Sequence, residues 1–186
     1  MPFSERIVQT PLNEKETERL MTGERVLLTG VIYTARDAVH QRLAETLMTQ
    51  GAASLPFSLN GQVLYYTGPA PAKPGQVIGP AGPTTSSRMD PTTPLLLEYG
   101  LKGMIGKGDR SQEVVDAIKR YRAVYFAAVG GTGVLLARKV IKAEAIAYHD
   151  LGPEAVYRLE VRDFPVIVAI DTRGTNIYRE THLQQE

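Results

Sequence analysis

Three cationic side chains in this sequence each follow an apolar stretch, in a loop or at a helix start. They are Arg36, Arg88 and Lys107. The guanidinium of arginine is a planar fork that matches a carboxylate, and lysine supplies a compact positive charge. Because ligand-binding groups of open α/β sheets gather where the strands end, these cations are predicted to converge on one small dianion. The hydroxyls of Thr84 and Thr85 lie close by in the sequence.

Segment 82–90, Gly-Pro-Thr-Thr-Ser-Ser-Arg-Met-Asp, is the densest group of such side chains. It carries four hydroxyls, a guanidinium and a carboxylate, which predicts an exposed loop that grips a small anion. Ordinary turn chemistry is the alternative, because Gly-Pro favours a turn and Ser87 and Asp90 have the spacing of a capping box. The local pattern leaves both interpretations open.

A helix is expected to open at Thr34 and to run to about residue 50. Thr34 and Asp37 have the spacing of an N-cap and its partner in the first turn. Apolar residues recur every fourth position and predict a buried stripe, namely Val39, Leu43 and Leu47. Arg36 and His40 lie on a different face near the helix start. They form either a solvated first turn or part of an anion site.

Lys107 lies between two glycines, which would let the backbone approach a ligand closely. This is not a phosphate loop, because Leu101 stands where the motif requires its first glycine. A tight turn with an exposed lysine is the alternative. Segment 130–133, Gly-Gly-Thr-Gly, does not complete a dinucleotide fingerprint, because Leu136 stands where the third glycine should be.

The remaining pattern alternates strands with helices. Strands are expected at 7–10, 24–33, 62–67, 101–105, 123–129, 144–148, 156–161 and 165–171. Further helices are expected after Asn13, at about 93–99 and after Ser111. Segment 68–83 holds five prolines and four glycines and is predicted to be a shaped functional loop or lid. These elements predict one compact, layered α/β or α+β domain.

Composition restricts the classes of function. The chain has 186 residues, with 21 Lys plus Arg against 20 Asp plus Glu, so its net charge of +1 gives no electrostatic reason to expect nucleic acid or a membrane as partner. No apolar run approaches the length of a membrane span. The first residues do not form a signal peptide, and we expect a cytoplasmic protein. With no cysteine and three histidines, the chain is expected to hold no metal itself.

Four stretches together resemble the β subunit, or C-terminal domain, of the iron–sulfur hydro-lyases, the class I fumarases and L-tartrate dehydratases. The stretches are 33–40 (Tyr-Thr-Ala-Arg-Asp-Ala-Val-His), 82–90, 106–108 (Gly-Lys-Gly) and 170–174 (Ile-Asp-Thr-Arg-Gly). The string Gly-Pro-Thr-Thr followed by Arg-Met-Asp is the specific one, and the resemblance spans nearly the whole chain. Pro91 and Pro94 depart from the unbroken helix expected after this string, and they favour a helix start near Thr93.

The resemblance implies a single domain over residues 1–186 with the swivelling β/β/α layered fold. It implies a partner, an α subunit that carries a [4Fe–4S] cluster on three cysteines, and the absence of cysteine here agrees with that division. The substrate would be a small dicarboxylate bound between the two chains. The assembly would be a hetero-oligomer, or a homodimer through this chain.

The resemblance also implies roles for single residues. Arg36, Arg88 and Lys107 would bind the substrate carboxylates, and Thr84 would take part in proton transfer at carbon with Thr85 beside it. The hydroxyl of threonine is far too basic to be ionised at neutral pH, so it needs a carboxylate from the partner or a cation such as Lys107. An open iron site on the partner would act as a Lewis acid on the leaving hydroxyl.

Three functions fit these features. The first is the β subunit of a fumarate hydratase, which interconverts fumarate and L-malate. The second keeps the chemistry but changes the substrate to tartrate or another hydroxy-diacid, with discrimination by groups that meet the extra hydroxyl. The third is a non-catalytic dicarboxylate-binding domain, since this chain has no metal ligands of its own.

Overall fold

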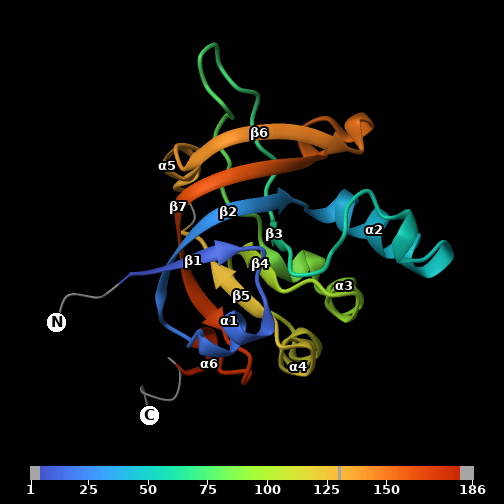
Figure 1. The fold of residues 1–186 in the computed structure, drawn as a ribbon, viewed down its shortest axis with the longest axis vertical. Helices are drawn as coiled ribbons and strands as arrows, with labels where there is room; N and C mark the ends of the chain where they lie inside the picture. The colour runs from blue at the N-terminus through green and yellow to red at the C-terminus, as the bar shows by residue number, and fades with distance from the viewer. Residues whose placement is uncertain (1–4, 130, 181–186) are drawn as a thin grey trace.

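The computed structural model describes residues 5–129 and 131–180. In this part of the chain the strands are β1 (Arg6–Thr10), β2 (Arg25–Thr34), β3 (Val63–Tyr65), β4 (Gly103–Gly106), β5 (Val124–Ala127), β6 (Val140–Ala147) and β7 (Val156–Ile170). The α-helices are α1 (Glu14–Arg19), α2 (Asp37–Thr49), α3 (Thr93–Glu98), α4 (Gln112–Tyr121), α5 (Gly133–Ala137) and α6 (Ile177–Glu180). Short 3-10 turns are η1 (Ala52–Ser54), η2 (Ser86–Met89) and η3 (His149–Glu154). Figure 1 shows their arrangement.

One sheet contains all seven strands in the order β1-β2-β3-β4-β5-β7-β6. The first five strands pair in parallel, and β7 runs antiparallel to β2, β5 and β6. Because β7 pairs with both β5 and β2, the strands β2, β3, β4, β5 and β7 close into a barrel-like sheet. Because β2, β3 and β4 pair in parallel, their carboxyl ends lie at one edge.

Two apolar clusters lie on opposite faces of this sheet. On β5, Val124 and Phe126 belong to the cluster inside the barrel, whereas Tyr125 between them packs against the helices. This alternation follows the two-residue period of a strand. Helices α2, α3 and α4 cover the outer cluster (Figure 1), and α2 uses the expected stripe of Val39 and two leucines. Each fully buried side chain of this size stabilises the fold by about 1.5–3 kcal/mol.

The α/β class predicted from the sequence is confirmed, with a mixed sheet that closes into a barrel-like form. The strands expected at 156–161 and 165–171 are one continuous strand, β7. Pro165 sits opposite Leu27 in this strand, and Asp163 adopts a positive φ of 50° beside an irregularity in the register. Segment 68–83 has no regular structure, as expected, and projects beyond β6 (Figure 1). Within the described ranges, no helix is both long and apolar enough to cross a membrane.

The helix cap predicted at Thr34 is wrong. Helix α2 begins at Asp37, and Arg36 is its N-cap residue. The hydroxyl of Thr34 instead donates to the carbonyl of Ala155 at 3.2 Å and accepts from the backbone N–H of Tyr157 at 2.9 Å. Thr34 is therefore the last residue of β2, and its hydroxyl is used by buried backbone groups of Ala155 and Tyr157 and not by the start of α2.

A buried ion pair joins the two loops that the sequence singled out. The side chain of Arg110 is completely buried, and its Nε donates to Asp90 Oδ1 at 2.6 Å. The second oxygen of Asp90 accepts from the backbone N–H of Ser111 at 2.7 Å. The capping box offered as the alternative for Ser87 and Asp90 is therefore wrong, since the carboxylate of Asp90 binds Arg110 and Ser111 instead.

The Arg110 guanidinium has further partners that offset the loss of its hydration. Its Nη2 donates to Thr93 Oγ1 at 2.9 Å and to the Tyr66 hydroxyl at 3.3 Å. It also lies 5.3 Å from the ring centroid of Tyr66 and 4.9 Å from that of Tyr125. Burial alone would lower the pKa of Arg110, but Tyr66 and Asp90 raise it, so the group stays charged.

His40 lies in the outer cluster, so the solvated first turn offered as one interpretation is wrong for this residue. Its side chain is buried and packs edge-on against Tyr66, with 5.1 Å between the ring centroids. Nδ1 lies 3.2 Å from Thr92 Oγ1, and Nε2 has no hydrogen-bond partner among the described residues. Burial, followed by the nearby charge of Arg110, lowers the pKa of His40 to about 3. The imidazole is therefore neutral at physiological pH.

Because His40 is buried and neutral, the free energy of unfolding depends on pH. Between about pH 6.5 and pH 3 the unfolded chain binds a proton at position 40 that the folded chain does not, so stability falls as the pH falls. From pH 7 to pH 5 this one group should remove about 2 kcal/mol from the free energy of unfolding. Urea unfolding at both pH values should show a smaller loss for His40→Gln than for the wild type. An identical loss in both proteins would contradict a neutral His40.

The Arg110–Asp90 pair gives a second expectation. Asp90→Asn keeps the shape of the side chain but leaves a buried guanidinium without its counter-charge, which should lower the free energy of unfolding by about 3–5 kcal/mol. Asp37→Asn is the matched control, because its ion pair with Arg88 is half-exposed and should cost less than about 1 kcal/mol. Urea unfolding at neutral pH measures both. Equal, small effects would show that the buried pair does not hold the two loops.

Candidate functional site

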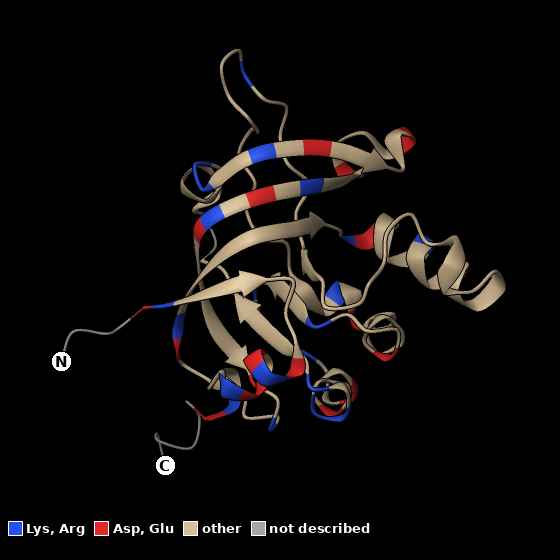
Figure 2. Cartoon of the chain, viewed as in Figure 1, with Lys and Arg blue, Asp and Glu red and all other residues tan. Residues whose placement is uncertain are grey.

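The residues predicted to bind an anion lie along one edge of the barrel-like sheet. Arg36 follows the carboxyl end of β2, and Lys107 follows the carboxyl end of β4. Strand β3 lies between these two strands, and the chain that leaves it leads to segment 82–90. Figure 2 shows basic and acidic positions side by side where β2 passes into α2. The edge therefore collects groups from three neighbouring parallel strands.

Backbone hydrogen bonds place the two threonines beside Lys107. Thr84 N donates to the carbonyl of Tyr66 at 2.7 Å, and Thr85 forms an isolated parallel bridge with Lys107. Ser86 N donates to the Lys107 carbonyl at 2.9 Å. Segment 84–86 thus extends the sheet next to the end of β4, and this contact between Thr85 and Lys107 is independent of side-chain rotamers.

Glycine is needed at position 106 because Ser86 packs against it, and not mainly because a ligand must approach the backbone there. A β-carbon at this position would lie 1.9 Å from Ser86 Oγ, which is inside any permitted contact. Ser86 is buried, and its hydroxyl lies 2.7 Å from the Tyr125 hydroxyl. Segment 82–90, which was expected to be an exposed loop, is thus exposed only in part. Its buried residues fasten it to the sheet, while Thr85 and Arg88 remain exposed.

Arg88 on η2 forms a two-point ion pair with the first residue of α2. Its Nε lies 3.0 Å from Asp37 Oδ1 and its Nη2 lies 2.6 Å from Asp37 Oδ2. Both side chains are about half-exposed, at 51% and 43%. Partial burial alone would raise the pKa of Asp37, but the hydrogen bonds from Arg88 and the charges of Arg88 and Arg36 lower it below its ordinary value. The carboxylate is therefore ionised at neutral pH.

Arg36 is held by a residue that the sequence did not single out. Its Nε donates to Glu154 Oε1 at 2.6 Å, and both side chains are about 30% exposed. Glu154 belongs to η3, between β6 and β7. The guanidinium also lies over Gly68, where a β-carbon would come within 2.8 Å of Arg36 Cζ. A side chain at position 68 would therefore require the Arg36 guanidinium to shift.

The structure links Arg36, Asp37 and Arg88 at the α2 end of the edge, and Thr84, Thr85 and Lys107 at the β4 end. Segment 82–90 connects the two groups, because it carries both Arg88 and the threonines. Their convergence on one ligand stays a prediction. Sequence reasoning missed Arg110 and Glu154; for Arg110, the signal was an arginine two residues after the Gly-Lys-Gly stretch, with Asp109 between them.

The stretch at 170–174 lies away from this edge. Strand β7 runs antiparallel to β2, so its carboxyl end lies near the start of β2. The carboxylate of Asp171 accepts backbone N–H groups of Thr22 at 3.1 Å and Arg173 at 2.9 Å. This stretch therefore closes a turn at the opposite end of the sheet. In segment 130–133, Gly130 lies outside the described residues, and the Gly133 carbonyl accepts from Ala81 N at 3.1 Å.

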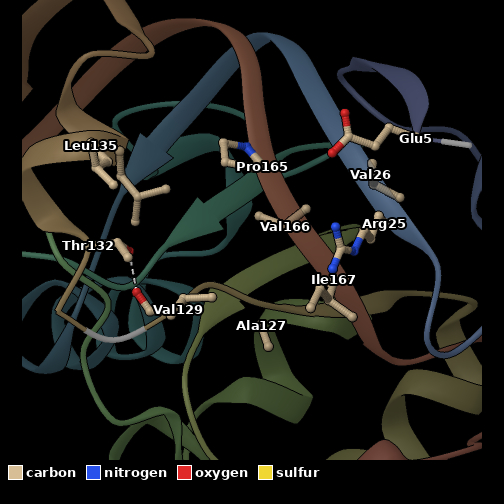
Figure 3. A pocket seen from close by; sticks show the side chains of 11 residues that line it. Glu5, Arg25, Val26, Ala127, Val129, Thr132, Leu135, Pro165, Val166 and Ile167 are labelled. Atoms are coloured by element: carbon tan, nitrogen blue, oxygen red, sulfur yellow. Dashed lines mark hydrogen bonds between the residues drawn. The ribbon is translucent and has the colours of Figure 1, made fainter. Parts of the chain in front are cut away.

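A separate apolar cavity of about 290 Å³ lies between the start of β2, the middle of β7 and α5 (Figure 3). Val26, Val166 and Leu136 contribute to its wall, with Glu5 and Arg25 as its charged members. None of the five predicted site residues lines it. A dicarboxylate needs several cations, so the polar edge and not this cavity is the candidate site.

The residues of this chain do not fit an iron–sulfur cluster. The sequence has no cysteine to supply a thiolate. Across residues 5–129 and 131–180, no group of three His, Cys, Asp or Glu side chains is placed to hold a metal ion.

Comparisons with known proteins show the family of this chain. A family model described as "Fumarase C-terminus" matches residues 4–181. The chain is 38% identical over 177 residues to the "Putative L(+)-tartrate dehydratase subunit beta" of Methanocaldococcus jannaschii, covering 92% of this chain and 90% of the relative. It is 37% identical over 158 residues to "Fumarate hydratase class I, anaerobic" of Escherichia coli K12, covering 84% of this chain and 28% of the relative.

"Fumarate hydratase 2" of Leishmania major is also 37% identical, over 161 residues that cover 86% of this chain and 28% of that protein. The chain thus spans little more than a quarter of the fumarate hydratases that it matches, but nearly all of the tartrate dehydratase subunit. The family model covers most of the chain, and the relatives, among them a class I fumarate hydratase and a protein named as a tartrate dehydratase β subunit, are more than one-third identical to it. This chain therefore belongs to the family of fumarase C-terminal domains.

Proposed function

We propose that this chain is the β subunit of an iron–sulfur-dependent hydro-lyase that interconverts fumarate and L-malate. The observation that carries the proposal is the pairing of Thr85 with Lys107 at the sheet edge that also bears Arg36 and Arg88. Hydroxyls and cations side by side suit a reaction in which a proton moves at carbon while negative charge grows on a carboxylate. Relatives named as fumarate hydratases support the same reaction.

The cations of the edge bind the two carboxylates of the substrate. Arg36 and Arg88 supply planar forks, and Lys107 supplies a point charge next to the threonines. When the C–H bond beside a carboxylate is broken, the electron pair spreads onto that carboxylate, and a fixed cation stabilises the charge as it develops. Fixed positions matter because the gain is largest when no group has to reorganise during the reaction.

Thr84 moves the proton. In dehydration its oxygen takes the proton from carbon while its own hydroxyl proton passes to a carboxylate of the partner, and that proton and the departing hydroxide make up the water released. In hydration the same transfers run in reverse, with water as the source of the hydroxide and of the proton. Its backbone is fixed by the hydrogen bond to Tyr66, and its carbonyl accepts from Lys107 N at 3.4 Å. A neutral hydroxyl needs help for this role, which Lys107 or a carboxylate of the partner provides. Thr85 lies beside it and binds substrate.

The partner is a cysteine-bearing α subunit that holds a [4Fe–4S] cluster, since this chain has no thiolate of its own. Support comes from the relative named as a subunit beta and from the fumarate hydratases, which have much additional chain. The exposed edge of this chain forms one wall of a site whose other wall the α subunit supplies.

Tartrate dehydration is the second candidate, and a specific observation favours it. A relative that matches 92% of this chain and is itself matched over 90% of its length is named "Putative L(+)-tartrate dehydratase subunit beta", whereas two fumarate hydratases are matched over only 28% of theirs. The same cations would bind tartrate, and discrimination would come from groups that meet its second hydroxyl. Turnover of L-malate and of tartrate by the intact complex separates the two.

Arg88→Ala tests the function directly. Loss of a charge-assisted clamp on a carboxylate should lower kcat/KM of the intact complex by about 10- to 150-fold, which corresponds to roughly 1.5–3 kcal/mol. Arg42→Ala is the control, because Arg42 also lies on the surface in an ion pair but outside the candidate site. Fumarate hydration followed by ultraviolet absorbance measures both. Near-normal turnover of Arg88→Ala in a folded complex would overturn the assignment.

A further inference from the structure

Both arginines proposed to bind substrate are already held by carboxylates of this chain. Arg88 pairs with Asp37 through Nε and Nη2. Arg36 pairs with Glu154 through Nε. The two acidic residues come from different elements, the first turn of α2 and the end of η3. Each arginine therefore uses its Nε to bind a carboxylate of this chain.

The atoms used in these pairs decide what remains for a ligand. A guanidinium presents two edges that can bind a carboxylate at two points: a side edge with Nε and one Nη, and an end edge with both Nη atoms. Asp37 occupies the side edge of Arg88, and Glu154 lies at the Nε side of Arg36. Among the described residues, no hydrogen bond of Arg88 Nη1, or of either Nη atom of Arg36, is present. A planar donor set is left open on each arginine.

A third arginine, Arg42 of α2, binds a carboxylate through the end edge of its guanidinium and not through the side edge. Arg42 of α2 pairs with Asp150 of η3 through Nη1 and Nη2, so its end edge is taken up by the protein. This pair joins α2 to η3, and the Arg36–Glu154 pair joins the N-cap residue of α2 to η3. In Arg42, however, the end edge with both Nη atoms is occupied and cannot bind a ligand at two points. It acts as a structural clasp, and the contrast indicates that the free end edges of Arg36 and Arg88 are a feature of the site.

We propose that Asp37 and Glu154 are positioning residues, which fix Arg88 and Arg36 so that their end edges face the carboxylates of the substrate. The proposal rests on the proposed function. A long side chain loses rotamer freedom when it binds a ligand, and a protein carboxylate that fixes it beforehand removes that cost from binding. Gly68 adds to the same effect, because the absence of a side chain there gives the Arg36 guanidinium its place.

The opposite role would be competition, in which Asp37 and Glu154 occupy the arginines until the substrate displaces them. In that case removal of the carboxylate would tighten substrate binding. The geometry favours positioning, because the substrate can bind the end edge while the side edge stays paired. The two roles predict changes of opposite sign in KM.

The test uses Asp37→Asn and Glu154→Gln in the complex of this chain with its cluster-bearing partner, with fumarate and L-malate as substrates. Each change keeps the shape of the side chain and removes the charge that holds the arginine. We expect KM to rise about 2- to 12-fold, the range that corresponds to ordering one long side chain, with a smaller change in kcat. Asp150→Asn, which breaks the Arg42 clasp between the same elements, should leave KM unchanged.

A double-mutant cycle separates positioning from a general structural effect. Asp37→Asn should raise KM in the wild type but add little in the Arg88→Ala background, because the residue acts through Arg88. The arginine Nε–H signals in nitrogen-15 NMR of the full chain give a readout that does not need activity. Asp37→Asn should speed solvent exchange at Arg88 Nε and leave Arg36 Nε unaffected.

Failure of this inference is distinct from failure of the proposed function. An unchanged or lowered KM for Asp37→Asn, while Arg88→Ala remains strongly impaired, would overturn positioning and leave the hydro-lyase assignment standing. Unimpaired turnover of both Arg36→Ala and Arg88→Ala would overturn the assignment itself. Rapid exchange at Arg88 Nε in the wild-type chain would contradict the ion pair on which the inference depends.

Discussion

The buried ion pair between Arg110 and Asp90 is the constraint on which the candidate site depends. Asp90 ends the segment that carries the threonines and Arg88, and Arg110 follows Lys107 by three residues. Their 2.6 Å contact therefore fixes two loops relative to each other beneath the sheet edge. A buried pair of this kind contributes little net stability compared with apolar packing, but breaking it is costly. The pair thus specifies one arrangement of the loops more than it strengthens the fold.

The closed sheet explains why the polar residues can be exposed without loss of the core. Side chains alternate between the barrel interior and the layer beneath α2, α3 and α4, so both faces of the sheet are satisfied by apolar contacts. The carboxyl edge is then free to carry Arg36, Arg88 and Lys107, held by Glu154, Asp37 and the Thr85 bridge respectively. In the proposed function, this edge forms one wall of the site, and the α subunit encloses the substrate there.

The sequence alone predicted the α/β class, the start of α3 near Thr93 and the cap of α4 at Ser111, because local periodicity and cap chemistry decide those features. It failed where distant partners decide. Thr34 looked like a cap but bonds to β7, and Asp90 looked like the end of a capping box but pairs with Arg110. For His40, a solvated first turn was one of two interpretations, because the local pattern does not show that Tyr66, which follows β3, packs against it. Glu154 lies in no recognisable pattern, so only the structure shows that it holds Arg36.

The most direct test of a shared hydro-lyase site is to purify the tagged chain from its own cells without oxygen, and to measure iron together with the copurifying protein. A stoichiometric cysteine-bearing partner with about four iron atoms per pair, and turnover of L-malate or tartrate by that complex, is the predicted result. Intact, folded chain that brings down neither iron nor a partner would contradict it. Arg36, Arg88 and Lys107 would then form a dicarboxylate-binding edge without catalytic purpose.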